Sequence, residues 1–474
     1  MSTTDTSAPR RAYALDALRG FAILTMILSG RIPFGPLPEW MYHIQVPPPL
    51  HKFNPAIPGI SWVDLVFPFF LFAMGAAFPF ALSSRIAKGA SVWKISGQIL
   101  VRGILLIFFA VVIQHIRPHI LAKTPETTTY LIALLNFLFL GLIFTRFPSG
   151  WGKNITYVLR GIGFSGIVTF LLLWTYPDGS GFSIKRFDII ILVLANVSIV
   201  GSFIWYFTRD NLLLRLGIIG LLFAIRISGM DDGWIKSAAA HHPALILLHA
   251  NFLKYLFIVI PGTIAGDIIL NWMKGKTEVE STGNWGNIAW MNILIISFSL
   301  VLFQLIFLYN RQVLTGTIIS VVYSLLMFLS MKRPGSSTEK MLLSLFQWGF
   351  FWLLLGLLLE PFEGGIKKDH STMSYYFVTS GLSACMIIGF TVIINHFKQH
   401  RWIGFLIENG QNPMLSYAGG TNLLTPIVML LGIDPLLSLF LTTPWLGVLK
   451  GIILTGLLAV MVSFATRKQV FWRT

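Results

Sequence analysis

Charged residues are scarce in this chain of 474 residues. Asp, Glu, Lys and Arg make up only 11% of it, whereas hydrophobic residues make up 55% and the mean hydropathy is +0.74. A typical soluble domain is about 25% charged. A water-soluble fold cannot hide this much apolar surface, so a soluble protein is excluded and the lipid bilayer must be the solvent.

Several patterns that carry chemistry are also missing. The single cysteine, Cys385, excludes an internal disulfide and a thiolate metal cluster. The chain has no Walker loop, no dinucleotide fingerprint, no HExxH and no paired His/Cys spacing, so we expect no metal. Carboxylates are rare within the apolar runs, with Asp267 among the few, whereas ion-coupled transporters usually keep such groups.

Long apolar runs, by contrast, are abundant. A membrane-spanning helix needs about 20 mostly apolar residues. Candidate helices lie near residues 13–30, 62–83, 96–116, 128–145, 155–175, 187–207, 211–228, 244–272, 288–308, 312–331, 341–360, 374–395, 412–432 and 446–466. We therefore predict an all-α, polytopic transmembrane bundle of about 11–14 spanning helices.

Two of these runs are irregular, and the chain shows no domain boundary. Pro261-Gly262 interrupts the run at 244–272, and the run at 211–228 carries two arginines. We find no internal repeat, no glycine-serine linker and no low-complexity tract. We predict one domain over residues 1–474, with a core at 13–116 and 341–466 and extra helices within 120–340.

The net charge is +16, from 35 Lys and Arg against 19 Asp and Glu. Such an excess in a soluble protein would suggest nucleic acid, but these residues lie in short loops, so we expect membrane lipid and no nucleic acid as partner. Loops rich in Lys and Arg face the cytoplasm, which places both termini there and the loop at 31–61 on the other side. The loop at 361–371 shares that side although Lys367 and Lys368 make it basic.

The loop at 31–61 is rich in proline and holds His43, His51 and Asn54. Proline restricts the backbone, so the loop is expected to be ordered, and long ordered loops are often functional. Asp64 follows Ser61 by three residues, which is the spacing of a capping box at the start of a helix. The alternative is that Asp64 polarises a loop histidine.

Charged and hydroxyl residues mark two further candidate sites. Asp16 and Arg19 are three residues apart on the first helix, so they form an ion pair or bind an anionic ligand from the cytoplasmic side. Lys368 precedes Ser374 and Tyr375, and a lysine before such a helix can hold phosphate or carboxylate. The alternative for the lysine is a side chain that snorkels to the interface.

A third candidate site is the segment ENGQNPMLSY at residues 408–417. Asn409 and Asn412 precede Pro413, which fits a turn that leads into a helix with proline at its first position. The same amides could hydrogen-bond a sugar or an acyl carbonyl.

Four segments together resemble the heparan-α-glucosaminide N-acetyltransferase family and its bacterial relatives. They are LDALRGFAILTMIL, SWVDLVFPFFLFAMGAA, GGIKKDHSTMSYYFVTSG and ENGQNPMLSY. The resemblance covers residues 13–83, 356–385 and 405–420. It implies a bacterial inner-membrane enzyme that moves an acetyl group from cytoplasmic acetyl-CoA to an amino sugar such as glucosamine on the other side.

The resemblance also assigns residues. The family's catalytic histidine lies in the first non-cytoplasmic loop, and the best match is His51, because HKFN followed by PGISWVD is similar to the family's stretch. The spacing to Asp64 is longer than in the family, which makes His43 a competitor. Lys368 matches a family lysine, and Ser29 stands where the family has an asparagine.

The chemistry of that histidine stays open at this point. A neutral imidazole can accept the proton of the attacking amine, or it can carry the acetyl group itself. Two other functions also remain: a transporter or flippase for a sugar or lipid-linked sugar, and a non-catalytic relative. A transporter would tolerate His51→Ala and His43→Ala, whereas a transferase would not. The oligomeric state, a homodimer included, stays open as well.

Overall fold

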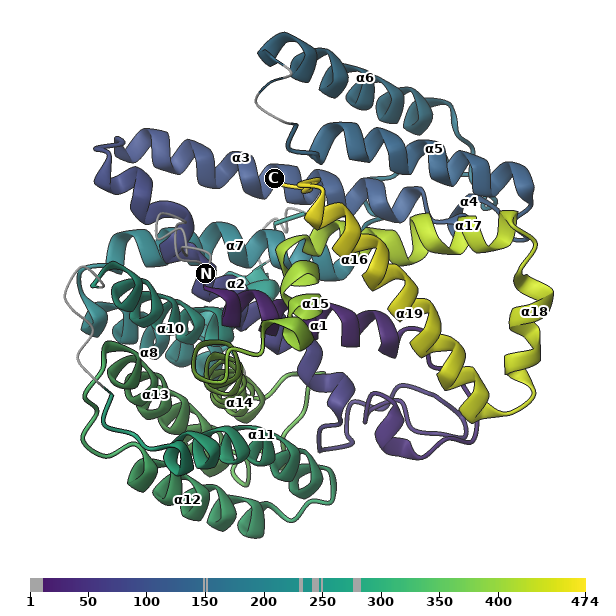
Figure 1. Cartoon of the computed structure of the whole chain (residues 1–474). Coiled ribbons are helices and arrows are strands. Elements are labelled where there is room, and N and C mark those ends of the chain that lie inside the picture. Colours follow the sequence, from purple (N-terminus) through teal and green to yellow (C-terminus); the bar gives the residue numbers. More distant parts are fainter. Residues whose placement is uncertain are drawn as a thin grey trace, which may run out of the picture.

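A computed structural model describes residues 12–147, 150, 152–229, 233–240, 247, 248, 250–275 and 283–474. Within these ranges the chain folds into helices and the loops between them, with no β-strand (Figure 1). The all-α prediction is therefore confirmed.

Eleven helices of the described chain are long and apolar enough to cross a membrane. They are α2 (Trp62–Ala87), α3 (Val92–His115), α5 (Thr127–Phe144), α6 (Gly152–Leu173), α7 (Ile189–Thr208), α10 (Leu256–Lys274), α11 (Asn287–Tyr309), α12 (Val313–Ser330), α13 (Ser337–Leu359), α14 (Met373–Thr391) and α19 (Pro444–Arg467). A bent pair over 413–441 makes twelve if it counts as one span. The predicted range of 11–14 is thus confirmed.

The other predicted segments form shorter helices. The first predicted segment forms α1 (Tyr13–Ser29), and the run with two arginines forms α8 (Leu212–Ser228). The predicted run at 412–432 forms α16 (Pro413–Gly419) and α17 (Thr425–Leu430), joined by a π-helical turn. Pro261 lies inside α10, and residues 244–246 and 249 of that predicted run lie outside the described residues.

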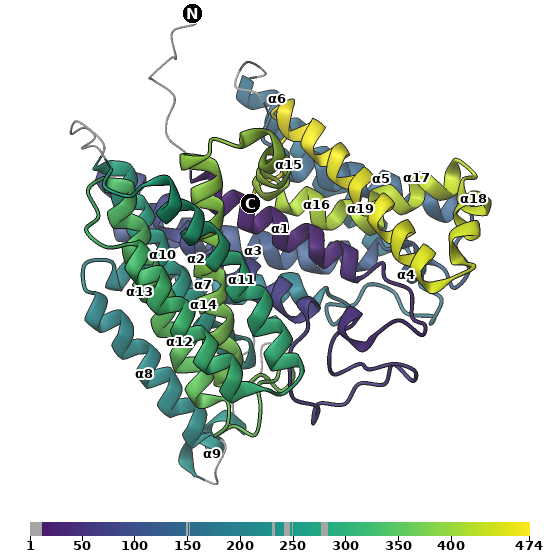
Figure 2. The same cartoon turned by 60° about the horizontal axis from the view of Figure 1, so that its bottom comes forward.

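Connecting helices complete the described chain. They are α4 (Pro118–Leu121), α9 (Trp234–Ala240), α15 (His400–Gln411) and α18 (Asp434–Ser438), with short 3-10 or π turns at 39–41, 250–255, 392–396, 420–424 and 439–441. Most of them lie near the ends of the bundle (Figures 1 and 2).

The centre of the bundle is built from α14, α2 and α10. Of the most apolar stretch of α14, 94% is buried, against 17% for α6, which therefore faces lipid. Burial all round requires a helix that is apolar on every face, and α14 buries its whole length from Met373 to Thr391. This burial fixes the ends of α14 and α2, from which the loops below project.

Glycines let α2 and α10 approach backbone to backbone. A Cβ atom added at Gly75 of α2 would lie well inside van der Waals contact with the carbonyl oxygen of Val259 in α10. The same holds for Gly262 against Phe72. Small residues at such contacts are a principal means by which transmembrane helices associate.

Loops far apart in the sequence gather at each end of the bundle. At one end, Gly59 of the first loop donates its backbone N–H to Ile366 O at 2.7 Å, so the loops at 31–61 and 361–371 lie together. At the other end, Asn412 donates to Val470 O at 2.8 Å and Arg19 donates to Gly410 O at 3.1 Å. The two described ends of the chain therefore share one side, and its assignment to the cytoplasm stays a prediction.

We predict that Gly75→Ala destabilises the protein by about 1–3 kcal/mol, because the added methyl group forces α2 and α10 apart. Thermal unfolding in detergent measures the effect. Gly217→Ala in α8 is the matched control, because nothing lies within 4 Å of a Cβ atom there. An equal melting temperature for Gly75→Ala and the wild type would contradict the close approach.

Candidate functional site

Asp64 lies in the first turn of α2 with its side chain fully buried. Its Oδ2 atom accepts hydrogen bonds from Ser61 N at 3.0 Å, Ser61 Oγ at 3.2 Å and Ile44 N at 3.3 Å. A carboxylate at this place satisfies free N–H groups and lies favourably at the positive end of the helix dipole. The capping reading of Asp64 is therefore correct for Oδ2.

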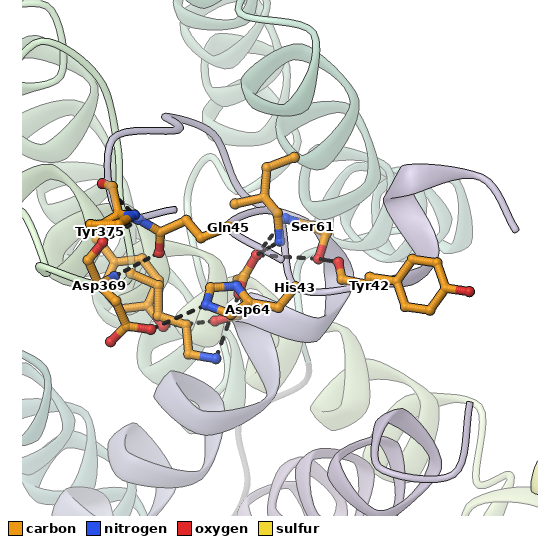
Figure 3. Close-up of polar contacts among 10 residues, drawn as sticks. Tyr42, His43, Gln45, Ser61, Asp64, Asp369 and Tyr375 are labelled. Carbon is orange, nitrogen blue, oxygen red and sulfur yellow. Dashed lines mark hydrogen bonds and ion pairs between the residues drawn. The ribbon is translucent and has the colours of Figure 1, made fainter. Parts of the chain in front are cut away.

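The other oxygen of Asp64 faces a histidine. Oδ1 lies 2.6 Å from Nδ1 of His43 and 3.6 Å from Nζ of Lys368, so its contacts with described residues are those of an ion pair. Asp64 thus caps α2 with one oxygen and contacts a loop histidine with the other (Figure 3). It also explains why the loop at 361–371 is basic, because Lys368 balances a buried carboxylate.

A second carboxylate, Asp369, meets the other ring nitrogen of His43. Its Oδ2 atom lies 3.1 Å from Nε2. Gln45 fixes this residue by accepting from Asp369 N at 2.9 Å and donating to Asp369 O. The side chain of Asp369 is 40% exposed, whereas that of Asp64 is not exposed at all. The site therefore reaches the surface of the protein at Asp369.

These contacts change the acidity of the two loop residues. Burial by itself would lower the pKa of His43, but the hydrogen bond with Asp369 and the contact with Asp64 outweigh burial and raise it. The hydrogen bond from His43 is in turn the largest cause that lowers the pKa of Asp369, and Lys368 adds to it. A histidine held between two carboxylates can take up and release protons near neutral pH.

Two further predicted residues lie at this site. Tyr375 is fully buried and donates its hydroxyl to Asp64 O at 2.7 Å, which ties the start of α14 to the start of α2. Ser374 is also buried, with its hydroxyl on Thr372 Oγ1 at 2.9 Å and its N–H on Glu363 at 2.7 Å. Ser374 therefore stabilises the first turn of α14 and takes no part in the contacts of His43.

His51 does not lie beside Asp64. Its ring packs between Phe34 and Tyr42, with centroid separations of 4.8 and 4.6 Å, and its nitrogens have no hydrogen-bond partner among the described residues. Asn54 accepts from Ala56 N at 3.0 Å and shapes the loop. His51 therefore supports the loop through Tyr42, while His43 meets the carboxylates.

The other predicted residues lie at the opposite end of the bundle. Arg19 and Asp16 form an ion pair at 3.1 Å. Asn409 donates to Ala459 O at 3.1 Å, and Asn412 accepts from Trp472 N at 3.0 Å. Both amides thus hold helices together, and neither reaches His43.

A cavity of about 210 Å³ lies between α1, α2, α3, α7 and α16 near Arg19. Apolar side chains such as Phe70 and Met74 form most of its wall, and Arg19, Arg102 and Arg473 supply positive charge. Such a lining fits an anionic molecule with an apolar part. No cluster of three His, Cys, Asp or Glu side chains in the described ranges is arranged to hold a metal.

Sequence reasoning missed Asp369 and Gln45 as members of the site. The available signal was that Asp369 directly follows Lys368 in a loop that breaks the charge rule on the side of His43. Gln45 is two residues after His43, and nothing in its local sequence distinguishes it from a solvated loop residue.

Comparison with known proteins gives two findings. A family model described as a domain of unknown function, DUF5009, matches residues 11–269. The chain is also similar to heparan-alpha-glucosaminide N-acetyltransferase, with 30% identity to the Mus musculus protein over 112 residues and 27% to the Homo sapiens protein over 107. These stretches cover 24% and 23% of this chain but only 15% and 14% of the relatives, and they confirm the resemblance.

We predict that His43 titrates above 6.5, the ordinary pKa of a histidine, and that Asp369→Asn lowers its pKa, because the substitution removes a carboxylate that stabilises the imidazolium. NMR of ¹⁵N-histidine-labelled protein in detergent measures both values. His43→Gln identifies the resonance, and His51→Gln is the control that leaves it in place. An unchanged pKa of His43 in Asp369→Asn would contradict the arrangement.

Proposed function

The chain belongs to the DUF5009 family, and from this premise we propose that it is a membrane acyltransferase. It moves an acetyl group from cytoplasmic acetyl-CoA to the amine of an amino sugar on the other side of the membrane. The observation that carries the proposal is His43 held between Asp64 and Asp369. The partial likeness to two N-acetyltransferases supports the reaction class.

His43 is the group that moves the proton. Asp64 holds Nδ1 from a fully buried, capped position, so Nε2 is the nitrogen that faces the reactants. An amino sugar arrives as an ammonium ion, and Asp369 offers it a partly exposed carboxylate. When the ammonium takes the place of the imidazolium at Asp369, His43 releases its Nε2 proton to solvent, and Nε2 is then free to accept a proton from the amine.

The amine, after giving one proton to Nε2, attacks the thioester carbonyl carbon, so that a C–N bond forms and the C–S bond breaks. The proton on His43 passes to the thiolate, and the second amine proton leaves through Asp369 to solvent. In a two-step transfer the same Nε2 atom would carry the acetyl group instead.

The arginine-lined cavity is the proposed donor site. The phosphates of acetyl-CoA need positive charge, and Arg19, Arg102 and Arg473 line this cavity. Its wall residue Phe70 lies six residues after Asp64 on α2, about 9 Å along the helix. A thioester on an extended arm can bridge such a distance, which supports donor entry from the end opposite His43.

His43→Ala is expected to lower acetyl transfer by about 10²–10⁴-fold, because the general base is lost. The assay uses purified protein in detergent with labelled acetyl-CoA and glucosamine or small amino-sugar glycans. His51→Ala is the control, and we expect it to keep most of the activity because His51 only packs against Phe34 and Tyr42.

Loss of transfer in His51→Ala alone would assign the role to His51. No transfer and no acetyl-CoA binding by the wild type would favour the transporter or the non-catalytic relative.

Arg102→Gln is expected to raise KM for acetyl-CoA by about tenfold and to leave KM for the acceptor unchanged, because a charged phosphate contact is removed. Steady-state kinetics with each substrate varied in turn gives the two constants. Arg160→Gln, at an exposed position of α6, is the matched control. Equal KM values for acetyl-CoA in both variants would place the donor elsewhere.

A further inference from the structure

A second cavity, of about 530 Å³, lies at the end of the bundle opposite His43. It is bounded by the last residues of α2, α7 and α10, the first turn of α8, and Trp348 of α13. Within the described part of the chain these helix ends lie next to one another (Figures 1 and 2). The donor cavity has a separate set of lining residues, so neither the proposed donor nor the proposed acceptor occupies this space.

The wall of this cavity contains a buried ion pair. Arg215 of α8 is 1% exposed and lies 2.5 Å from Asp267 of α10. Arg215 also donates to Thr208 Oγ1 at 3.1 Å and Thr263 Oγ1 at 3.2 Å, and Trp205 donates to Asp267 at 2.9 Å. Charges within a membrane are costly unless they are paired, so this pair fixes α8 against α7 and α10 and shapes the wall.

Two further cationic side chains, Arg209 and Lys274, line the cavity and take no part in the Arg215–Asp267 ion pair. Lys274, at the end of α10, makes no ion pair with a described residue. Arg209 donates to Tyr206 O at 2.6 Å and lies over the Tyr206 ring, and its one carboxylate contact, at 3.3 Å, is with Asp210, whose side chain is 84% exposed and therefore solvated. An exposed pair of this kind contributes little, so both cations remain able to bind an anion.

The same cavity also has an apolar wall. Leu212, Ile264, Ile268 and Trp348 line it next to the cations. The outer face of α8 exposes further apolar side chains, Leu213 and Leu221 among them, as expected for contact with acyl chains. A ligand that fits must therefore carry a negative head group and an apolar tail.

We propose that this cavity binds the phosphate head group of a glycerophospholipid from the leaflet at this end of the bundle. Arg209 and Lys274 hold the phosphate diester, Asn271 adds an amide donor, and the acyl chains leave between α8 and α13. Basic pockets between transmembrane helices bind lipid phosphates in this way. The site is independent of acetyl transfer and stays in place if the proposed reaction fails.

The test is native mass spectrometry of the purified full chain with added dioctanoyl phosphatidylglycerol. The wild type is expected to bind one lipid, and Arg209→Gln with Lys274→Gln to bind it about 30-fold more weakly, at about fivefold for each cation. Both substitutions leave Arg215 and Asp267 unchanged, so α8 keeps its anchor. Circular dichroism and thermal unfolding confirm that the variant is folded.

The matched control is Lys153→Gln with Arg160→Gln on α6, which removes two exposed positive charges away from the cavity. Equal weakening in both double variants would show a non-specific charge effect and overturn the proposal. Glycerol 1-phosphate, the head group without acyl chains, forms the second arm. If it binds as tightly as the lipid, the ligand is a soluble phosphate and the lipid proposal fails.

Discussion

The buried carboxylate of Asp64 is the constraint around which one end of the bundle is arranged, the end that holds the loops at 31–61 and 361–371. A fully buried charge is unfavourable by several kcal/mol unless it is paired and hydrogen-bonded. The chain meets this demand from three separate segments: the imidazole of His43 with the N–H group of Ile44, the N–H group of Ser61, and the ammonium of Lys368. Satisfying one carboxylate therefore brings together the first loop, the start of α2 and the loop before α14.

That requirement also accounts for the loop at 361–371. On the predicted topology, its lysines oppose the usual bias of positive charge toward the cytoplasm. Lys368 lies 3.6 Å from Asp64, so its charge is used inside the protein and does not act as a free topology signal. The hydroxyl of Tyr375 on Asp64 O fixes α14 at the same place, and α14 is the most buried helix of the described chain.

The geometry also separates positions that look alike in the sequence. His43 and His51 lie in the same proline-rich loop, and the family resemblance favours His51 because HKFN followed by PGISWVD is similar to the family's stretch. In the structure the loop folds back over residues 45–54, with Asn54 N donating to Gln45 O at 2.8 Å, and His43 is the histidine that meets Asp64. Sequence spacing predicts contacts along one helix, but it says little about a loop that reverses on itself.

Local patterns in the amino-acid sequence are enough to predict that the protein lies in lipid, where its helices run and which residue types form the site. Apolar runs of membrane length can satisfy their backbone hydrogen bonds in lipid only as helices, which is why the predicted segments reappear with small shifts at their ends. The capping role of Asp64 followed from local spacing in the same way. The tertiary structure decided which histidine meets Asp64, that Asp369 and Gln45 belong to the site, and that Asp267 pairs with Arg215. These contacts join residues more than fifty positions apart or across a reversed loop, and only the packing of the whole bundle brings them within hydrogen-bonding distance.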